Sequence, residues 1–212
     1  NIGVWLMRNM RSRMPVALEK QDWPAVLAVE PELAALVASY PGLAELKPTF
    51  FDPYSALALA HIGQFAAAEA RLRPMPADCY PCLRARAQVA ALQGHDARAD
   101  FWFARAVAEG SSIPFADAEW GRTLLQRGQP DAAIAKFQSA NRRGPKFADP
   151  LEGWGEALMA KNQSHLALAK FAAAEKLAPN WGRLNLKWGQ ALLHAGKPEE
   201  AQKQFARAAQ LD

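Results

Sequence analysis

The sequence has few cysteines, no long apolar run and few signs of β-structure. Cys79 and Cys82 are its only cysteines, which excludes a framework of several disulfides. The longest uncharged apolar stretch near the start, Ile2 to Met7, is far shorter than the roughly 18 residues of a membrane-spanning helix. Runs rich in Val, Ile and Thr are absent, while Ala and Leu dominate. The composition predicts an all-α protein without membrane insertion.

Motifs of common catalytic sites are missing as well. There is no glycine-rich phosphate loop, no H-E-x-x-H zinc motif and no G-x-S-x-G nucleophile turn. The histidines stand at no metal-ligand spacing; they are His61, His95, His165 and His194. We therefore predict a protein that is not an enzyme and that holds no cofactor and no metal.

Cys79 and Cys82 form a lone C-x-x-C motif in a helical neighbourhood. Pro81 favours the start of a helix, which would place Cys82 in the first turn, where the helix dipole favours a thiolate. Two interpretations remain open: a local disulfide if the domain is exported, or two free thiols if it is cytosolic. A redox-active pair is a third and weaker alternative. The compartment, cytoplasmic or periplasmic, is not determined by the sequence, although an oxidised pair would favour the periplasm.

Three Trp-Gly pairs recur at a spacing of 34 residues and define a tandem repeat. They begin at Trp120, Trp154 and Trp188. A period of this length is that of one helix-turn-helix unit, which buries its apolar face only by stacking on its neighbours. The sequence therefore predicts stacked helix pairs.

Other residues recur at fixed offsets from each pair. Leu124, Leu158 and Leu192 lie four residues after each Trp, which predicts one buried face on a first helix. Gly128, Asn162 and Gly196 stand where that helix must end, and these residue types suit a left-handed cap. A second helix carries Ala and Phe at spacings of four and three, which predicts a narrow buried stripe: Ala133, Phe137, Ala140, Ala167, Phe171, Ala174, Ala201, Phe205 and Ala208. Pro145 and Pro179 end the second helices.

This pattern resembles the tetratricopeptide repeat, W-x2-L-G-x2-Y followed by A-x3-F, A and P. One departure is systematic: Trp stands where the family has Leu before the Gly, while the family's own Trp position holds Asp117, Leu151 and Asn185. The resemblance implies an α-α superhelix, a solenoid of stacked antiparallel helix pairs, that acts as a protein-interaction scaffold. The strong signal covers the repeats 114–147, 148–181 and 182–212.

The same period extends toward the start of the chain with a weaker signal. Residues 80–113 keep the later offsets and form a fourth repeat, and 49–79 form a degenerate repeat that breaks early at Pro74 and Pro76. Residues 1–48 are predicted as a divergent helical pair or cap, with helices at 16–20 and 25–37 and a turn between them. The segment Ile2 to Met7 is either a buried first helix or the remnant of a longer apolar segment. Because no signal-peptide layout is visible and the chain begins without Met, we expect it to be part of a larger protein.

The excess positive charge lies in the strong repeats, where residues 114–212 hold 14 basic and 10 acidic residues. Arg142, Arg143 and Lys146 share one predicted turn, which is either a solvated turn or a contact for an acidic partner. An RNA-binding helical-repeat protein is the main alternative to a protein-binding scaffold. The aromatic residues, however, lie on the predicted core stripe, whereas single-stranded nucleic acid requires exposed aromatics. No nucleic acid is therefore expected as a partner.

The predicted function is binding of a peptide or helix from a partner protein in the concave groove of the solenoid. The residues expected to face it lie on the first helices, away from the core positions. They are Arg84, Gln88, Arg122, Leu125, Gln126, Glu152, Glu156, Met159, Arg183, Lys187, Gln190 and His194. The repeats stop at Leu211-Asp212 without a polar capping helix, from which we expect possible self-association through the last repeat.

Overall fold

The computed structural model describes residues 13–18, 20–40, 42, 44–45 and 47–211, and its regular elements are helices. The segment Ile2 to Met7 and Asp212 lie outside the described residues. Two compact units make up the chain, Asn1–Glu109 and Gly110–Asp212. The predicted all-helical class is confirmed, and no helix within the described residues has the length and apolarity to cross a membrane.

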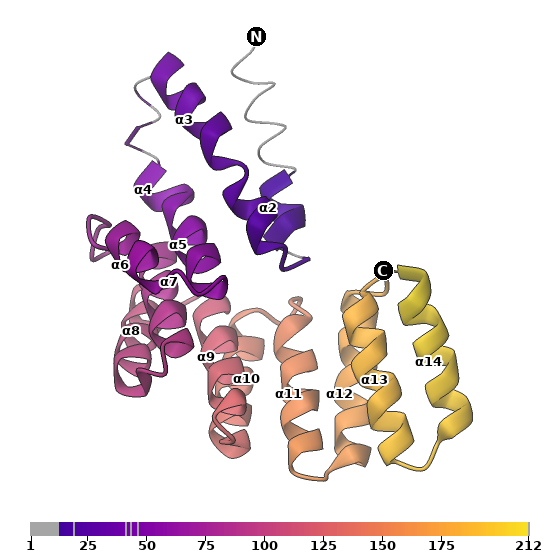
Figure 1. The fold of residues 1–212 in the computed structure, drawn as a ribbon. Coiled ribbons are helices and arrows are strands. Elements are labelled where there is room, and N and C mark those ends of the chain that lie inside the picture. Colours follow the sequence, from indigo (N-terminus) through magenta and orange to yellow (C-terminus); the bar gives the residue numbers. More distant parts are fainter. Residues whose placement is uncertain (1–12, 19, 41, 43, 46, 212) are drawn as a thin grey trace. The chain divides into compact units, whose positions relative to one another are not determined.

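The second unit consists of antiparallel helix pairs that follow one another along the chain (Figure 1). The pairs are α9 (Phe115–Gln126) with α10 (Pro130–Arg143), α11 (Asp149–Ala160) with α12 (Ser164–Leu177), and α13 (Gly182–His194) with α14 (Pro198–Leu211). Each helix packs against the next, and the first helix α11 also contacts α9 and α13. The first helices are therefore neighbours, so that residues at equivalent repeat positions come close together.

The Ala and Phe stripe of the second helices is buried in α10 and α12, as the spacing predicts, whereas Phe205 of α14 is half-buried. Phe137 and Phe171 have no exposed surface, and the flanking alanines of α10 and α12 are equally buried. The glycine of each Trp-Gly pair makes room for these rings. A Cβ on Gly155 would lie 2.7 Å from Phe171 Cζ, which is closer than such atoms approach. A burial of this kind, about 1.5–3 kcal/mol for each large side chain, is what holds one pair to the next.

The turns within the pairs have the left-handed residues that the sequence predicts. Gly128 has φ 71°, Gly196 φ 74°, and Asn162, a residue with a side chain, φ 58°. In each turn the residue after this position returns its N–H to the first helix, as Gln129 does to Leu124 O at 3.0 Å. These bonds satisfy carbonyls that the helix end leaves free.

The Trp of each Trp-Gly pair is half-buried, which corrects the prediction that it lies in the core. Its ring packs at the edge of the core. For Trp120 and Trp154, a lysine from the second helix covers the other side of the ring, whereas the equivalent position beside Trp188 is Gln204. Lys136 Nζ lies 3.3 Å from the centroid of Trp120, and Lys170 Nζ 3.5 Å from that of Trp154. The core position four residues later is occupied by Leu158, which is 6% exposed. A lysine stem can cover an aromatic ring and keep its ammonium in water, so the outer ring face is shielded without full burial.

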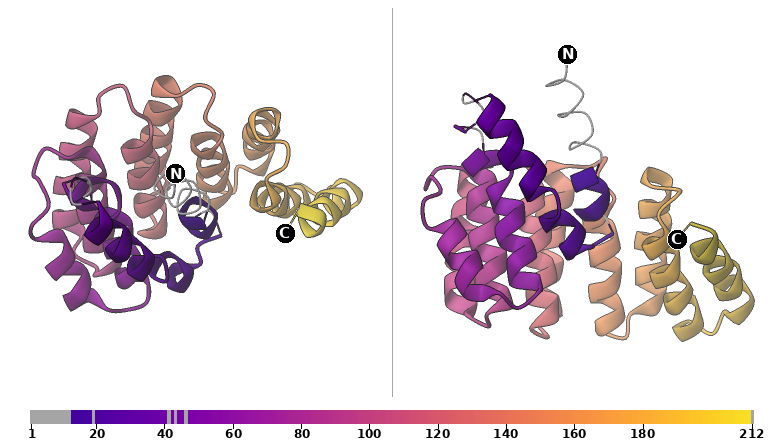
Figure 2. Two further views of the ribbon diagram at one scale, coloured as in Figure 1. Left: turned by 90° about the horizontal axis from the view of Figure 1, so that it is seen from above. Right: turned by 45° about the horizontal axis from the view of Figure 1, so that its top comes forward.

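The first unit begins with shorter and less regular helices and ends with the longer pair α7 and α8 (Figures 1 and 2). Residues 13–18 are helical, and the chain continues through α2 (Trp23–Leu27), α3 (Glu30–Ser39), α4 (Lys47–Phe50), α5 (Asp52–His61), α6 (Phe65–Leu72), α7 (Tyr80–Leu92) and α8 (Asp96–Glu109). The predicted helix 25–37 is wrong: it is divided at Ala28 and Val29 into α2 and α3. Pro31 is the physical cause, because it has no N–H to donate to Leu27 and its ring collides with that carbonyl.

Arg86 compensates for the early end of α6, a short helix in the segment 49–79 that the sequence predicts as a degenerate repeat. The helix ends at Leu72, before Pro74 and Pro76, as predicted. The guanidinium of Arg86 on α7 donates to Leu72 O at 3.0 Å, Met75 O at 2.7 Å and Pro76 O at 3.0 Å. Arg86 occupies the repeat position of Trp120, so that one side chain supplies both the packing and the hydrogen bonds that the shortened repeat lacks.

Candidate interaction surface

The candidate site is the row of first helices α9, α11 and α13 in the second unit. Ten of the residues predicted to contact a partner lie on these helices, and their repeat spacing aligns them. Arg122, Glu156 and Gln190 occupy one repeat position, and Leu125 and Met159 occupy another. The two further predicted residues, Arg84 and Gln88, lie on α7 in the first unit, where Gln88 Nε2 donates to Arg84 O at 3.5 Å.

Charged side chains of the three helices form a network of ion pairs. Glu152 of α11 accepts two hydrogen bonds from Arg183 of α13, from Nε at 3.0 Å and from an Nη at 2.8 Å. On its other side, Arg122 of α9 contacts Asp149 at 2.6 Å and reaches Glu152 Oε2 at 4.0 Å. Because two guanidinium nitrogens bond two carboxylate oxygens, the planes of the guanidinium and the carboxylate are aligned, and Arg183 is held in one orientation.

A second ion pair lies further along the same helices. Lys187 Nζ of α13 is 2.7 Å from Glu156 Oε1 of α11. Lys187 is spaced four residues from Arg183, as Glu156 is from Glu152, so the second pair repeats the first one turn later. Successive first helices are therefore joined by pairs of opposite charge.

Burial changes the proton affinity of this network. Burial raises the pKa of Glu152 above its ordinary value, and the nearby Glu156 adds to the rise, while Arg183 and Arg122 oppose it. For Arg122, burial alone would lower the pKa, but Asp149 and Glu152 outweigh it and leave the guanidinium pKa raised. Arg122 therefore stays charged, whereas Glu152 is the group whose charge depends on its partners.

The exposure of the predicted residues differs from the expectation in one clear case. Glu152 has no exposed surface, so the prediction that it faces solvent is wrong. A repeat comparison supplies the missing signal: 34 residues earlier stands Ala118, which is 2% exposed. An acidic residue on a helix surface looks solvated by itself, and only the neighbouring repeat reveals a buried position.

Arg122, Glu156, Met159 and Lys187 are half-buried where free exposure was expected, and the ion pairs explain this for the three charged residues. Gln126, Gln190 and His194 are exposed as expected.

An apolar row runs beside the ion pairs. Leu125 of α9 and Met159 of α11 are half-buried at equivalent positions, and Leu193 of α13 continues the row with 49% of its surface exposed. Leu193 was not among the predicted residues, although it follows Met159 by 34 residues. The row offers partly exposed apolar side chains next to fixed charges, the combination that binds amphipathic segments.

The basic cluster at 142–146 is partly neutralised. Arg143 Nε lies 3.4 Å from Asp117 Oδ2, and Asp117 is itself buried and accepts a hydrogen bond from Ser139 at 2.8 Å. Asp117 stands where the repeat consensus has Trp, and its carboxylate holds Arg143 and Ser139 at the end of α10. The paired Arg143 is a poorer contact for phosphate than a free guanidinium would be.

In the first unit, Cys79 and Cys82 are joined by a disulfide, with their Cα atoms 5.2 Å apart. The predicted helix start is close to the observed one: Cys79 is the N-cap of α7, and Pro81 lies in the first turn. Within the described residues, no group of three or more His, Cys, Asp or Glu side chains is arranged to hold a metal ion.

Comparison with known proteins finds likeness in structure alone. No protein-family profile matches the sequence, and no curated protein matches it. Among solved structures, one of MamA matches with a TM-score of 0.59 at 18% identity, over 72% of this chain and 91% of that one. A double mutant of MamA from RS-1 matches with a TM-score of 0.58 at 16% identity, over 77% and 94%.

YrrB, described as a TPR protein with an unusual peptide-binding site, matches with a TM-score of 0.54 at 17% identity, over 81% of this chain and 91% of that chain. The helix pairs, their repeated core and these matches define the class: the chain has the tetratricopeptide-repeat fold, an α-α solenoid of stacked antiparallel helix pairs.

Proposed function

We propose that this chain is a non-enzymatic scaffold that binds a peptide or helix of a partner protein along α9, α11 and α13. The observation that carries the proposal is the apolar row of Leu125, Met159 and Leu193. These side chains belong to three successive helices and remain partly exposed. Burying them on a partner gains roughly 25 cal/mol for each Å² of apolar surface.

The ion pairs beside the row supply specificity. Arg183 and Lys187 are held by Glu152 and Glu156, so that their remaining N–H donors have fixed directions before a partner arrives. A peptide that presents apolar side chains to the row and carbonyls or carboxylates to these donors binds without first ordering them. Preorganisation of this kind lowers the entropic cost of association.

The same pairing disfavours nucleic acid as the ligand. The cations of the surface stand against carboxylates, as Arg122 does against Asp149. Affinity for a polyanion rests on the release of counterions by unpaired Lys and Arg. The proposed partner is therefore an amphipathic peptide segment of low charge.

A peptide-display selection on the intact chain tests the proposal. Enriched peptides are then measured by fluorescence anisotropy against the wild type, Leu193→Asp and Leu166→Asp. Leu166, 57% exposed on the second helix α12, is a control matched in chemistry and exposure. We expect Leu193→Asp to weaken binding at least about tenfold, some 1.4 kcal/mol, and Leu166→Asp to change it less than about twofold.

Two results would contradict the proposal. One is selection that yields no enriched peptide. The other is a set of peptides that responds to Leu166→Asp but not to Leu193→Asp, which would place binding on the second helices. Retention on immobilised polyuridine that falls steeply with salt would favour the RNA-binding alternative instead.

A further inference from the structure

The disulfide of the first unit lies in surroundings that suit its reduced form. Cys79 is half-buried at the N-cap of α7, where its Sγ accepts a hydrogen bond from the N–H of Cys82 at 3.3 Å. The N–H of Cys82, in the first turn of the helix, therefore points at this sulfur. This N–H and the positive end of the helix dipole stabilise a thiolate more than they stabilise a disulfide sulfur, because they are attracted by negative charge.

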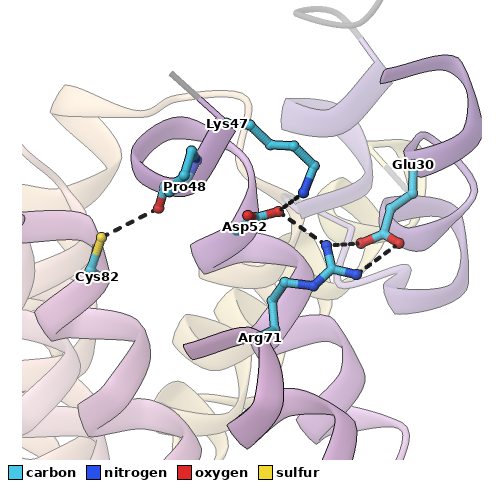
Figure 3. A network of polar contacts seen from close by, with 6 residues as sticks. All are labelled: Glu30, Lys47, Pro48, Asp52, Arg71 and Cys82. Atoms are coloured by element: carbon cyan, nitrogen blue, oxygen red, sulfur yellow. Dashed lines mark hydrogen bonds and ion pairs between the residues drawn. The ribbon is translucent and has the colours of Figure 1, made fainter. Parts of the chain in front are cut away.

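The second sulfur lies against a hydrogen-bond acceptor. Cys82 is completely buried, and its Sγ is 3.5 Å from the carbonyl oxygen of Pro48 on α4 (Figure 3). In a disulfide this sulfur carries no hydrogen and cannot donate to the oxygen. A protonated Cys82 thiol in the same place would donate its S–H to Pro48 O, so reduction adds a hydrogen bond inside the core.

The carbonyl is held in place by the charges around α4. Lys47 forms an ion pair with Asp52, and Asp52 also accepts from Arg71 Nη1 at 3.0 Å (Figure 3). Arg71 in turn bonds Glu30 of α3 at 3.2 Å. These contacts join α4 to α5, α6 and α3, and α5 packs against α7, so the acceptor for Cys82 is held by contacts that do not involve the cysteines.

We propose that Cys79–Cys82 is an exchangeable redox site that takes electrons from a small thiol of the glutathione class, with Cys79 as the sulfur that is attacked. This proposal is independent of the scaffold function, since its residues lie in the first unit. The disulfide closes a loop of only four residues, so it gains little stabilisation from restricting the unfolded chain. The hydrogen bonds of the reduced form therefore compete with only a small stabilisation of the folded chain by the disulfide.

The exchange is balanced in two steps. A thiolate of the reductant attacks Cys79 Sγ, a mixed disulfide forms, and the electron pair of the broken S–S bond leaves on Cys82 Sγ, which takes up one proton. A second reductant thiolate then attacks the reductant's own sulfur and releases Cys79 as a thiolate. The chain gains two electrons, and two reductant thiols become one disulfide.

Equilibration of the full chain with mixtures of reduced and oxidised glutathione tests the site. The dithiol and disulfide fractions are trapped with acid and maleimide and read by mass spectrometry, for the folded chain and for the same chain unfolded in urea. We expect the equilibrium constant for reduction to be at least tenfold larger in the folded chain. A purely structural disulfide gives the opposite order, because folding then protects it, and a constant equal to or below that of the unfolded chain overturns the proposal.

Single-cysteine variants test which sulfur is attacked. Cys82→Ser leaves only Cys79 and is expected to react with maleimide at least tenfold faster than Cys79→Ser, which leaves only the buried Cys82. Equal rates in two folded variants would overturn the assignment of Cys79. If circular dichroism shows that either variant is unfolded, the reduced wild type is used instead. It is labelled with less than one equivalent of maleimide, and peptide digestion then shows which of the two cysteines reacted first.

Discussion

Phe137 and Gly153 are in such close contact that no side chain fits between them. A Cβ placed on Gly153 would lie 2.4 Å from Phe137 Cε1. The same ring faces Gly121, the glycine of its own helix pair, where an added Cβ would lie 2.8 Å away. Phe137 is thus held between the first helix of its own repeat and that of the next. One aromatic ring joins two repeats, and both glycines are needed for it.

The first prediction follows from this contact. Gly153→Ala should destabilise the chain by about 1–3 kcal/mol, because the fully buried ring cannot move away from the added methyl group. The higher helix propensity of Ala returns at most about 1 kcal/mol. Urea unfolding followed by circular dichroism measures the change. Combining Gly153→Ala with Phe137→Leu should cost less than the sum of the two single changes, and simple additivity would show that the two residues are not in contact.

A second prediction concerns the loss of such a ring. Phe171→Ala should cost about 3–5 kcal/mol, because it leaves a cavity in the core between α11, α12 and α13. Hydrogen exchange should rise first in these helices, since repeats contact only their neighbours. Phe101→Ala is the control, because Phe101 is 54% exposed and should lose less than about 1 kcal/mol. Equal losses at both positions would mean that burial does not set the cost.

Backbone conformation alone sets the third prediction. A Cβ on Gly128 or Gly196 meets nothing within 4 Å, so the cost of a side chain there comes only from the positive φ. Val at either position should destabilise by about 1–2 kcal/mol, while Asn should cost much less, since Asn162 already adopts this conformation. Thermal unfolding compares the variants. If Val and Asn have the same effect, the left-handed cap is not what these positions require.

The fourth prediction uses the raised pKa of Glu152. Its ordinary value is 4.5, and the folded chain keeps the proton to a higher pH than the unfolded chain does. Where the unfolded carboxyl has lost its proton and the folded one has not, stability falls as pH rises; it levels off above the folded pKa. Glu152→Gln has no such group. The free energy of unfolding of the wild type minus that of the variant should therefore decrease as pH rises through and above the ordinary value of 4.5.

Only the slope with pH is compared here, because Glu152→Gln also loses its ion pair with Arg183. Urea titrations at a series of pH values give this difference. A difference that increases with pH would show that the arginines, and not burial, control the carboxyl.

Much of the fold could be predicted because each repeat gives an independent check on the role assigned to a position in the others. A residue type that returns every 34 positions, as Gly121, Gly155 and Gly189 do, must meet the same surroundings each time, and the Phe rings that face these glycines confirm it. In residues 1–48 no repeat supports the pattern. There the continuous helix predicted over 25–37 ignored Pro31, whose local effect prevails over apolar spacing.

The interaction surface was less predictable from sequence. The spacing placed Arg122, Glu152 and Arg183 on the first helices, but it could not show that these side chains contact one another across helices. Contacts between neighbouring repeats depend on the distance between helices, which is set by the small residues and rings of the core. The ion pairs can be assigned only when the distance between neighbouring helices is known.

The three hydrogen bonds from Arg86 to Leu72, Met75 and Pro76 bear on how an array of repeats tolerates changes of length. A deletion in one connecting loop would normally shift every later repeat out of alignment. Here a long side chain from the following repeat spans the shortened connection, and α7 still packs against both α5 and α6. The side chain of one residue thus satisfies the backbone of a shortened connection while the core between the helices is kept, so that a change of loop length can be tolerated wherever an arginine reaches across.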